Sequence, residues 1–233
     1  MDRPLIKNEY PLPANRPEAC WVFDLDNTLY PAECNLFGQI DDKMGAFISN
    51  LLDVDRVEAR RVQKDYFVRH GTTLRGLIDV HGVDPVEFLD FVHDIDLEVL
   101  SEDAALRETL QNLRGRKMVF TNGDIPYAGR VLDKLGIAGE FEGIFDISTA
   151  AYHPKPHTRT YKAFVNHFEI NPNNAVMIED MARNLVPAAQ MGMTTVWLRT
   201  GYKWGDAGYN ADHIHHETDH LVSWLNQCIE VVA

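Results

Sequence analysis

The stretch CWVFDLDNT occupies residues 20–28 and decides the fold. Its first four residues are apolar, which predicts a short buried strand. Asp24 and Asp26 follow where that strand ends, and residues two apart in an extended segment lie on the same side of the chain. Two carboxylates at such a short distance repel each other unless one is protonated or a cation lies between them. The pair fits a cation site, and it also fits an ordinary turn, because Asp and Asn are turn formers.

Two later segments repeat this pattern of an apolar run that ends in polar side chains. VFTNG at 119–123 ends in Thr121 and Asn122, and VMIED at 176–180 ends in two carboxylates. Lys155 lies between these segments, in an irregular stretch before a predicted helix. In parallel sheets, ligands bind beyond the carboxyl ends of the strands. The order of carboxylate pair, Thr-Asn, lysine and carboxylate pair therefore favours one shared polar site.

The composition argues against a nucleic-acid-binding protein and against a membrane protein. The chain has 233 residues, which suits one domain with an insertion or two small domains, and at 45% hydrophobic it can bury a core. The net charge of −13 argues against a nucleic-acid surface, which needs clustered Lys and Arg. No run approaches the roughly 18 apolar residues of a membrane span, and residues 1–17 lack the apolar core of a signal peptide. The three cysteines lack metal-site spacing and suit reduced thiols, so we expect a cytoplasmic protein.

Hydrophobic periodicity divides the chain into a helical block and an alternating region. Apolar residues recur at helical spacing from about residue 35 to about 103, where Asp55 and Asp84 are expected to begin helices. Strands are expected at 20–23, 117–120, 144–147, 175–178 and 194–198, helices at about 102–113, 125–135, 158–168 and 182–191, and a short strand with a final helix within 212–225. This alternation predicts an α/β fold with a parallel, three-layer sheet.

Together, these motifs resemble those of the haloacid dehalogenase (HAD) superfamily of aspartyl phosphatases. The resemblance implies a HAD-like Rossmannoid core, a three-layer parallel sheet with an all-helical C1 cap inserted as a lid over the active site. We expect residues 18–34 and 104–233 to form the core and residues 35–103 to form the cap. This block is too long for a single βα crossover, which favours a cap over helices that only pack on the sheet.

The same resemblance gives the polar residues roles in phosphoryl transfer. Asp24 is expected to be the nucleophile that forms an aspartyl-phosphate, and Asp26 the general acid that later acts as the base. The Thr121 hydroxyl, the Asn122 backbone N–H and the Lys155 ammonium are expected to bind the phosphoryl group. Superfamily dehalogenases and phosphonatases lack an acid at the position of Asp26. Its presence points to phosphate esters and leaves hydrolysis and phosphotransfer open.

Mg²⁺ is the expected cofactor, because it is a hard cation that combines few carboxylates with phosphate oxygens. The expected ligands are the carboxylates of Asp24 and Asp180 and the backbone carbonyl of Asp26. Glu179 is expected to lie beside them or to orient the lysine, and Asn184 to hold a metal-bound water. The alternative for Glu179 and Asn184 is that they only favour the first turn of a helix.

A narrower resemblance is to the pyrimidine 5′-nucleotidase branch of the superfamily. It rests on FDLDNTLYP at 23–31, GTTLRGL at 71–77, TNGD at 121–124 and VLDKLGI at 131–137. It implies nucleoside 5′-monophosphates such as UMP and CMP as substrates. Arg75, on a glycine-bounded cap loop, is expected to contact a phosphate or a nucleobase carbonyl. The alternative is an arginine that is simply solvated.

The chain departs from this branch at two places. Tyr127 stands where a histidine is common, and residues 179–181 read EDM rather than DDS. These changes keep the chemistry but leave the substrate open, so a phosphatase for a sugar phosphate or phosphoglycolate is the alternative. The complete set of catalytic residues argues against a non-catalytic binding protein. The four histidines within 213–220 fit a solvated stretch better than a metal site.

Overall fold

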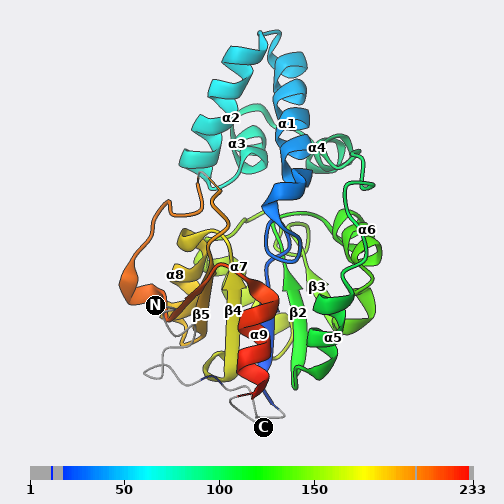
Figure 1. The fold of residues 1–233 in the computed structure, drawn as a ribbon. Helices are drawn as coiled ribbons and strands as arrows, with labels where there is room; N and C mark the ends of the chain where they lie inside the picture. Colours follow the sequence, from blue (N-terminus) through cyan, green and yellow to red (C-terminus); the bar gives the residue numbers. More distant parts are fainter. Residues whose placement is uncertain (1–11, 13–17, 203, 231–233) are drawn as a thin grey trace.

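A parallel sheet forms the centre of the molecule (Figure 1). The computed structural model describes residues 12, 18–202 and 204–230, so most of the predicted N-terminal lead-in lies outside the described residues. The strands are β1 (Cys20–Phe23), β2 (Arg116–Phe120), β3 (Gly143–Phe145), β4 (Ala175–Glu179), β5 (Thr194–Leu198) and β6 (His216–Thr218). All neighbours pair in parallel, in the order β3-β2-β1-β4-β5-β6. The expected α/β sheet is confirmed, with β1 and β4 at its centre.

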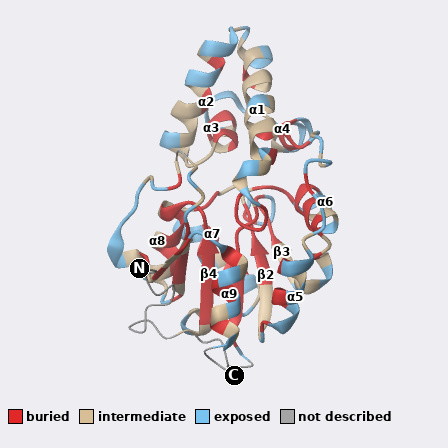
Figure 2. Ribbon diagram, viewed as in Figure 1, coloured by how far each residue is buried: buried red, intermediate tan, exposed pale blue. Residues whose placement is uncertain are grey.

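Helices cover both faces of this sheet, which gives the three expected layers. One face carries α5 (Ala104–Asn112), α6 (Ile125–Leu135) and α9 (Leu221–Glu230), and the other carries α7 (Thr158–His167) and α8 (Ala182–Gln190). The side chains of β1 alternate between the layers: Trp21 and Phe23 join the first core, and Cys20 and Val22 join the second. All four are buried, as Figure 2 shows for most of the sheet. Burial on both faces explains why the strands read as continuous apolar runs.

Four further helices gather beyond the carboxyl ends of the strands (Figure 1). They are α1 (Leu36–Leu52), α2 (Arg56–His70), α3 (Thr73–His81) and α4 (Pro85–Val92). The expected starts are confirmed, because Asp55 Oδ1 accepts a hydrogen bond from Glu58 N (2.9 Å) and Asp84 Oδ1 accepts one from Val86 N (2.8 Å). The helical insertion therefore stands over the edge of the sheet where the polar motifs end.

The structure corrects two predicted boundaries. β3 ends at Phe145 rather than at residue 147, because the Asp146 carboxylate accepts hydrogen bonds from the backbone N–H groups of Thr149 (2.8 Å) and Ile125 (3.2 Å) and so begins a turn. The final helix runs to Glu230 rather than ending near residue 225, since its buried residues Leu221, Trp224, Leu225 and Cys228 continue the same apolar face.

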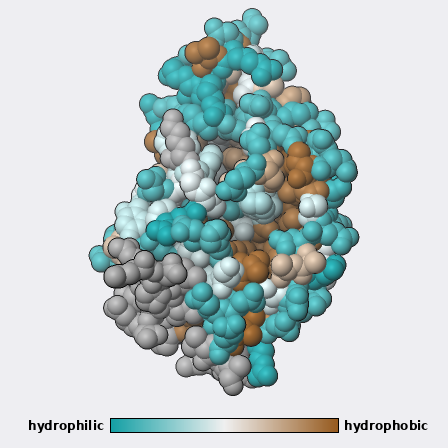
Figure 3. Space-filling view, viewed as in Figure 1, coloured by the Kyte–Doolittle hydropathy of each residue, from teal (hydrophilic) through white to brown (hydrophobic). Residues whose placement is uncertain are grey.

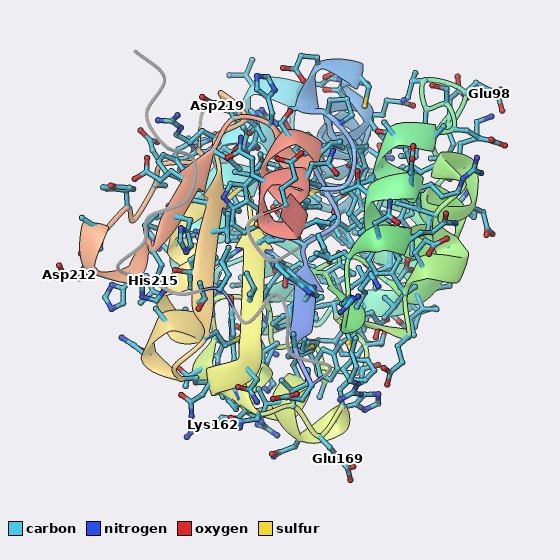
Figure 4. All side chains as sticks on the ribbon, turned by 60° about the horizontal axis from the view of Figure 1, so that its bottom comes forward. Glu98, Lys162, Glu169, Asp212, His215 and Asp219 are labelled. Atoms are coloured by element: carbon cyan, nitrogen blue, oxygen red, sulfur yellow. The ribbon has the colours of Figure 1, made fainter. Side chains whose placement is uncertain are left out.

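The histidine-rich stretch is more ordered than the expected solvated segment. His216 is fully buried in β6, and His215 Nδ1 accepts a hydrogen bond from Thr195 N of β5 (3.0 Å). Figure 4 shows His215 at the outer edge of the sheet, beside these strands. Within the described part of the chain, the groups of three or more potential metal ligands do not include these histidines. The stretch thus contains β6, which forms one edge of the sheet.

The surface agrees with the composition. Figure 3 shows hydrophilic residues over most of the cap on the visible face, with a hydrophobic group at its tip, where α1 and α2 meet and where Leu51 and Val57 are exposed. None of the described helices is long and apolar enough to cross a membrane. The three cysteines are all free thiols. The cytoplasmic location stays a prediction.

Two valines on helices give a matched test of the core. Val131 in α6 is fully buried, whereas Val57 in α2 is 80% exposed. We expect Val131→Ala to lower the free energy of unfolding by about 2 kcal/mol, because it removes two buried carbons and leaves a cavity. Val57→Ala should leave it unchanged or raise it slightly, since alanine favours helices. Urea unfolding measures both, and equal losses would contradict this assignment of the core.

Candidate active site

A cavity of about 140 Å³ lies between the helical insertion, the cap, and the carboxyl edge of the sheet. From the core side it is lined by Asp24, Asp26, Asn27, Asn122, Gly123, Lys155, Glu179, Asp180, Met181, Arg183, Asn184 and Tyr202. The structure therefore brings the carboxylate pairs, the asparagine and the lysine together, although Asp24 and Asp180 lie 156 positions apart in the chain.

Lys155 is the centre of this constellation. Its ammonium donates hydrogen bonds to Asp24 Oδ1 (2.6 Å), to Glu179 Oε2 (2.6 Å) and to the carbonyl oxygen of Phe120 (2.8 Å). The side chain is 1% exposed. Burial opposes its charge, but the two carboxylates outweigh that effect and hold the pKa of Lys155 above its ordinary value. Lys155 is therefore a fixed positive charge beside the candidate nucleophile, and Glu179 orients it.

The Thr-Asn motif supports this lysine. The Asn122 side chain accepts a hydrogen bond from Lys155 N (2.8 Å) and donates one to Lys155 O (3.3 Å). Thr121 is buried, and its hydroxyl oxygen accepts a hydrogen bond from Gly123 N (2.9 Å). Asn122 and Gly123 line the cavity, whereas Thr121 does not. The contacts of Thr121 and of the Asn122 backbone N–H with a phosphoryl group stay predictions.

Three carboxylates at the floor of the cavity can hold a cation. Asp24, Glu179 and Asp180 each offer an oxygen, and these oxygens lie within 4.8 Å of one another. Burial and then the charge of Glu179 raise the pKa of Asp24 to about 6, and the same two causes raise the pKa of Asp180. Lys155 contacts one oxygen of Asp24 and one of Glu179, so Asp24 Oδ2 and the carboxylate of Asp180, which Lys155 does not contact, are left for a cation. The donor set is all oxygen, which suits a hard divalent ion.

A buried acceptor beside this group also fits a metal site. Asn184 is 5% exposed and lines the cavity, and its Oδ1 has no hydrogen-bond partner within the described residues. A buried polar atom of this kind is costly unless a ligand or water satisfies it. A metal-bound water is the expected partner. Asp26 is not part of the carboxylate group, and a metal contact through its backbone carbonyl stays a prediction.

The loop after β1 serves both as a turn and as part of the site. The two interpretations of this segment, a turn and a cation site, are therefore compatible. Asn27 has a positive φ of 59° within this turn. The Thr28 hydroxyl donates a hydrogen bond to Asp24 Oδ2 (3.0 Å), and Asn27 Nδ2 lies 3.5 Å from Asp180 Oδ2. The turn residues thus fix the orientation of the Asp24 carboxylate.

Asp26 has partners that the sequence did not predict. Its Oδ1 accepts hydrogen bonds from the hydroxyl groups of Tyr30 (2.6 Å) and Tyr127 (2.7 Å). Burial and then the nearby charge of Asp24 raise the pKa of Asp26, so it keeps a proton at a higher pH than an exposed aspartate does. A raised pKa suits a general acid. Tyr127 is one of the two departures noted in the sequence, and the structure shows that it still contacts this acid.

The cap contributes mainly apolar side chains to the cavity. They are Phe37, Ile40, Met44, Phe67, Leu74, Phe88, Leu89 and Val92, joined by the polar residues Asp41, Gln63, Lys64, Thr72, Thr73 and His93. The helical spacing of the apolar residues of α1 predicted a helix here, but not which of its side chains line the cavity. The polar ones were not predicted, because a polar residue on a cap helix has no local signal that distinguishes a cavity wall from solvent.

Arg75, the predicted cap contact, is not brought into the cavity. Its guanidinium forms an ion pair with Asp79 one turn further along α3, with Nε 3.1 Å from Asp79 Oδ2. The cavity is lined instead by Thr72, Thr73 and Leu74. A role for Arg75 in substrate binding therefore stays a prediction that requires this ion pair to break.

Arg183 joins the core to the cap instead. Arg183 lies in the first turn of α8, shortly after the second carboxylate pair, and its side chain lines the cavity. Its NH2 group donates a hydrogen bond to Gly71 O (2.9 Å), and its guanidinium lies 4.0 Å from the centroid of the Phe67 ring. These contacts hold the cap against the catalytic edge in this structure.

The fold and this site define a family. Residues 19–192 match the model of the haloacid dehalogenase-like hydrolases, so the chain belongs to that family. It is 30% identical over 193 residues to Phosphate metabolism protein 8 of Saccharomyces cerevisiae, which covers 74% of this chain and 59% of that protein. It is 26% identical over 145 residues to glyceraldehyde 3-phosphate phosphatase of Pyrococcus furiosus, covering 60% and 58%. The chain spans less than two thirds of the length of these relatives.

Solved structures share the fold at low sequence identity. A HAD phosphatase from Thermococcus onnurineus aligns with a TM-score of 0.59 and 17% identity over 92% of this chain and 98% of that one. L-2-haloacid dehalogenase from Xanthobacter autotrophicus aligns with a TM-score of 0.57 and 12% identity over 92% and 99%. These likenesses show the fold alone. The expected HAD-like architecture is therefore confirmed, and a phosphatase activity stays a proposal.

Removing the buried ammonium tests the core of the site. We expect Lys155→Met to lower the free energy of unfolding by about 3 kcal/mol or more, because two buried carboxylates lose their partner. Lys43→Met is the matched control. The ammonium of Lys43 also pairs with a carboxylate, Asp94 (3.2 Å), but in solvent, where such a pair contributes at most about 1 kcal/mol. Urea unfolding near neutral pH measures both, and similar losses would contradict the described network.

Proposed function

We propose that this protein is a Mg²⁺-dependent phosphomonoester hydrolase that acts through an aspartyl-phosphate on Asp24. The observation that supports this best is the buried contact of Lys155 with Asp24 and Glu179, directly beside Asp180 and within one cavity. It supplies an oriented carboxylate nucleophile together with a fixed positive charge. Phosphoryl transfer depends chiefly on such positioning and electrostatic stabilisation.

The residues then act in two steps. An Asp24 oxygen attacks phosphorus, the bond to the ester oxygen breaks with its electron pair, and Asp26 donates a proton to that leaving oxygen. Asp26 next takes a proton from the water that attacks phosphorus, and the bond between phosphorus and Asp24 breaks to restore the carboxylate. Lys155 neutralises charge on Asp24 and on the phosphoryl oxygens throughout.

The proposed Mg²⁺ would be held by the Asp24 and Asp180 carboxylates, with Asn184 accepting from a bound water. When bound, it offsets the repulsion between the nucleophile and a dianionic phosphate ester. Asp24, Glu179 and Asp180 carry three negative charges when ionised, against one positive charge on Lys155. This excess of negative charge is what a divalent cation would balance.

Pyrimidine nucleoside 5′-monophosphates are the proposed substrates. The cap walls present aromatic and aliphatic side chains such as Phe37, Phe67 and Phe88 to the cavity. A nucleobase can pack against these surfaces, and the polar cap residues Gln63, Lys64 and Thr73 can donate hydrogen bonds to its carbonyl oxygens. The P. furiosus relative bears the name of a phosphatase for a small sugar phosphate, so another small metabolite remains the second candidate.

A substrate panel tests both parts of the proposal. We expect metal-dependent phosphate release, fastest from UMP or CMP, in a panel that also contains purine nucleotides, sugar phosphates and phosphoglycolate. EDTA should abolish release, and Asp24→Asn should lower kcat at least ~10³-fold, since the nucleophile is gone. Asp90→Asn, at an exposed position on α4, is the control. A preference for another ester would remove the nucleotide assignment, and unchanged release by Asp24→Asn would remove the mechanism.

The raised carboxyl pKa values predict how Mg²⁺ stabilises the protein. At about pH 5, Asp24, with a pKa of about 6, is mostly protonated and cannot bind the ion; at about pH 7.5 it is ionised. Mg²⁺ at ~100-fold above its Kd should therefore raise the Tm by about 5–10 °C at the higher pH and by less than half of that at the lower pH.

Thermal unfolding with and without Mg²⁺ measures this difference. Asp180→Asn removes one proposed ligand and should abolish the increment at both pH values. Equal increments at the two pH values, or an increment that survives in Asp180→Asn, would contradict binding at this carboxylate group.

A further inference from the structure

The general acid proposed above is held by two phenols. Tyr30 and Tyr127 both donate to Asp26 Oδ1, and their own hydroxyl oxygens lie 3.3 Å apart. Both rings are buried, with 2% and 0% exposure. A buried phenol needs a hydrogen-bond partner, so these hydroxyl groups fix the carboxyl group of Asp26 in one orientation.

This arrangement leaves one oxygen of Asp26 for chemistry. Within the described residues, the hydrogen bonds to the Asp26 side chain end on Oδ1. Asp26 itself lines the cavity, so Oδ2 is the atom available to a leaving oxygen or to water. Burial and then the charge of Asp26 hold the pKa of both phenols well above their ordinary value, so the phenols remain neutral donors.

The ring of Tyr127 is held in turn from the cap. His93, the residue after α4, stacks on it with ring centroids 4.3 Å apart and an interplanar angle of 13°. His93 Nδ1 lies 3.0 Å from Asp124 Oδ1, and the same carboxylate caps α6 by accepting a hydrogen bond from Tyr127 N (3.0 Å). The backbone of Tyr127 is thus fixed by the core, and its ring is fixed by a residue of the cap insertion.

The connection between cap and core at this point is direct. Arg130 of α6 donates a hydrogen bond to the carbonyl oxygen of His93 (2.6 Å), which ties the end of α4 to the helix that carries Tyr127. His93 also lines the cavity. A displacement of the cap that removed His93 would leave one side of the Tyr127 ring without its stacking partner.

We propose that Tyr30 and Tyr127 are positioning residues for Asp26. We further propose that His93, by stacking on Tyr127, makes this positioning depend on where the cap lies. The proposal rests on the phosphatase function given above. The tyrosines keep their protons throughout: the proton that reaches the leaving oxygen comes from Asp26, and the proton that Asp26 regains comes from water. Their role is to orient Asp26 Oδ2 toward the leaving oxygen when His93 of the cap is stacked on Tyr127.

Leaving groups of different basicity test this role. An alkoxide leaving group needs protonation, whereas p-nitrophenolate leaves without it. We expect Tyr30→Phe and Tyr127→Phe each to lower kcat/KM at least ~10-fold for the alkyl ester hydrolysed fastest in the panel, and less than ~3-fold for p-nitrophenyl phosphate. Tyr209→Phe, which removes an exposed phenol that donates to Glu217, is the matched control and should change neither value.

Two variants separate the role of the cap from simple damage. His93→Ala should show the same selective loss on the alkyl ester, and His93→Phe, which keeps a flat ring over Tyr127, should recover most of it. Urea unfolding of each variant checks that it is folded.

The outcomes distinguish this role from the proposed function. A wild type that hydrolyses neither ester would remove the phosphatase and this role with it. An active wild type whose tyrosine variants lose equally on both esters, or lose nothing, would overturn the positioning role alone. Equal losses in His93→Phe and His93→Ala would overturn the part assigned to the cap.

Discussion

A buried ammonium between two carboxylates is the interaction on which the rest of the site depends. Lys155 lies in a long loop after β3, and its reach to Asp24 and Glu179 connects the ends of the two central strands. Charges buried without partners are strongly unfavourable, so the loop, β1 and β4 must keep their relative positions. The same constraint that stabilises this edge of the sheet also orients Asp24, the proposed nucleophile.

The excess of negative charge around that lysine is a second consequence. One ammonium cannot balance three carboxylates, and burial together with the charge of Glu179 raises the pKa values of Asp24 and Asp180. The divalent cation proposed above would offset this excess of negative charge. The cap side of the cavity is mainly apolar, and electrostatic contacts are stronger where such walls exclude water.

Local signals in the sequence were sufficient for the core but not for the contacts of the cap. Apolar runs that end in polar side chains predicted β1, β2 and β4 and placed Asp24, Lys155 and Asp180 at one edge, because strand ends and sheet polarity follow from short-range rules. The end of β3 was wrong by two residues, since the turn depends on Asp146 meeting the backbone of α6.

Contacts between cap and core had no comparable local signal. The stacking of His93 on Tyr127 and the contact of Arg183 with Phe67 join residues far apart in the chain, and periodicity does not report how two helices meet. Tyr127 stood out only as a departure from a family pattern. Arg75, chosen for its place on a glycine-bounded loop, forms an ion pair with Asp79 in the structure.

The most direct test of the central claim is to trap the phosphoryl group on the nucleophile. Asp26→Asn should still react with p-nitrophenyl phosphate, because that leaving group needs no acid, but it lacks the base that activates water. Mass spectrometry of the acid-quenched variant should find one phosphoryl group on Asp24, and none in a variant that also carries Asp24→Asn. Release of p-nitrophenol with Asp24 unmodified, or with the phosphoryl group on another residue, would contradict the account.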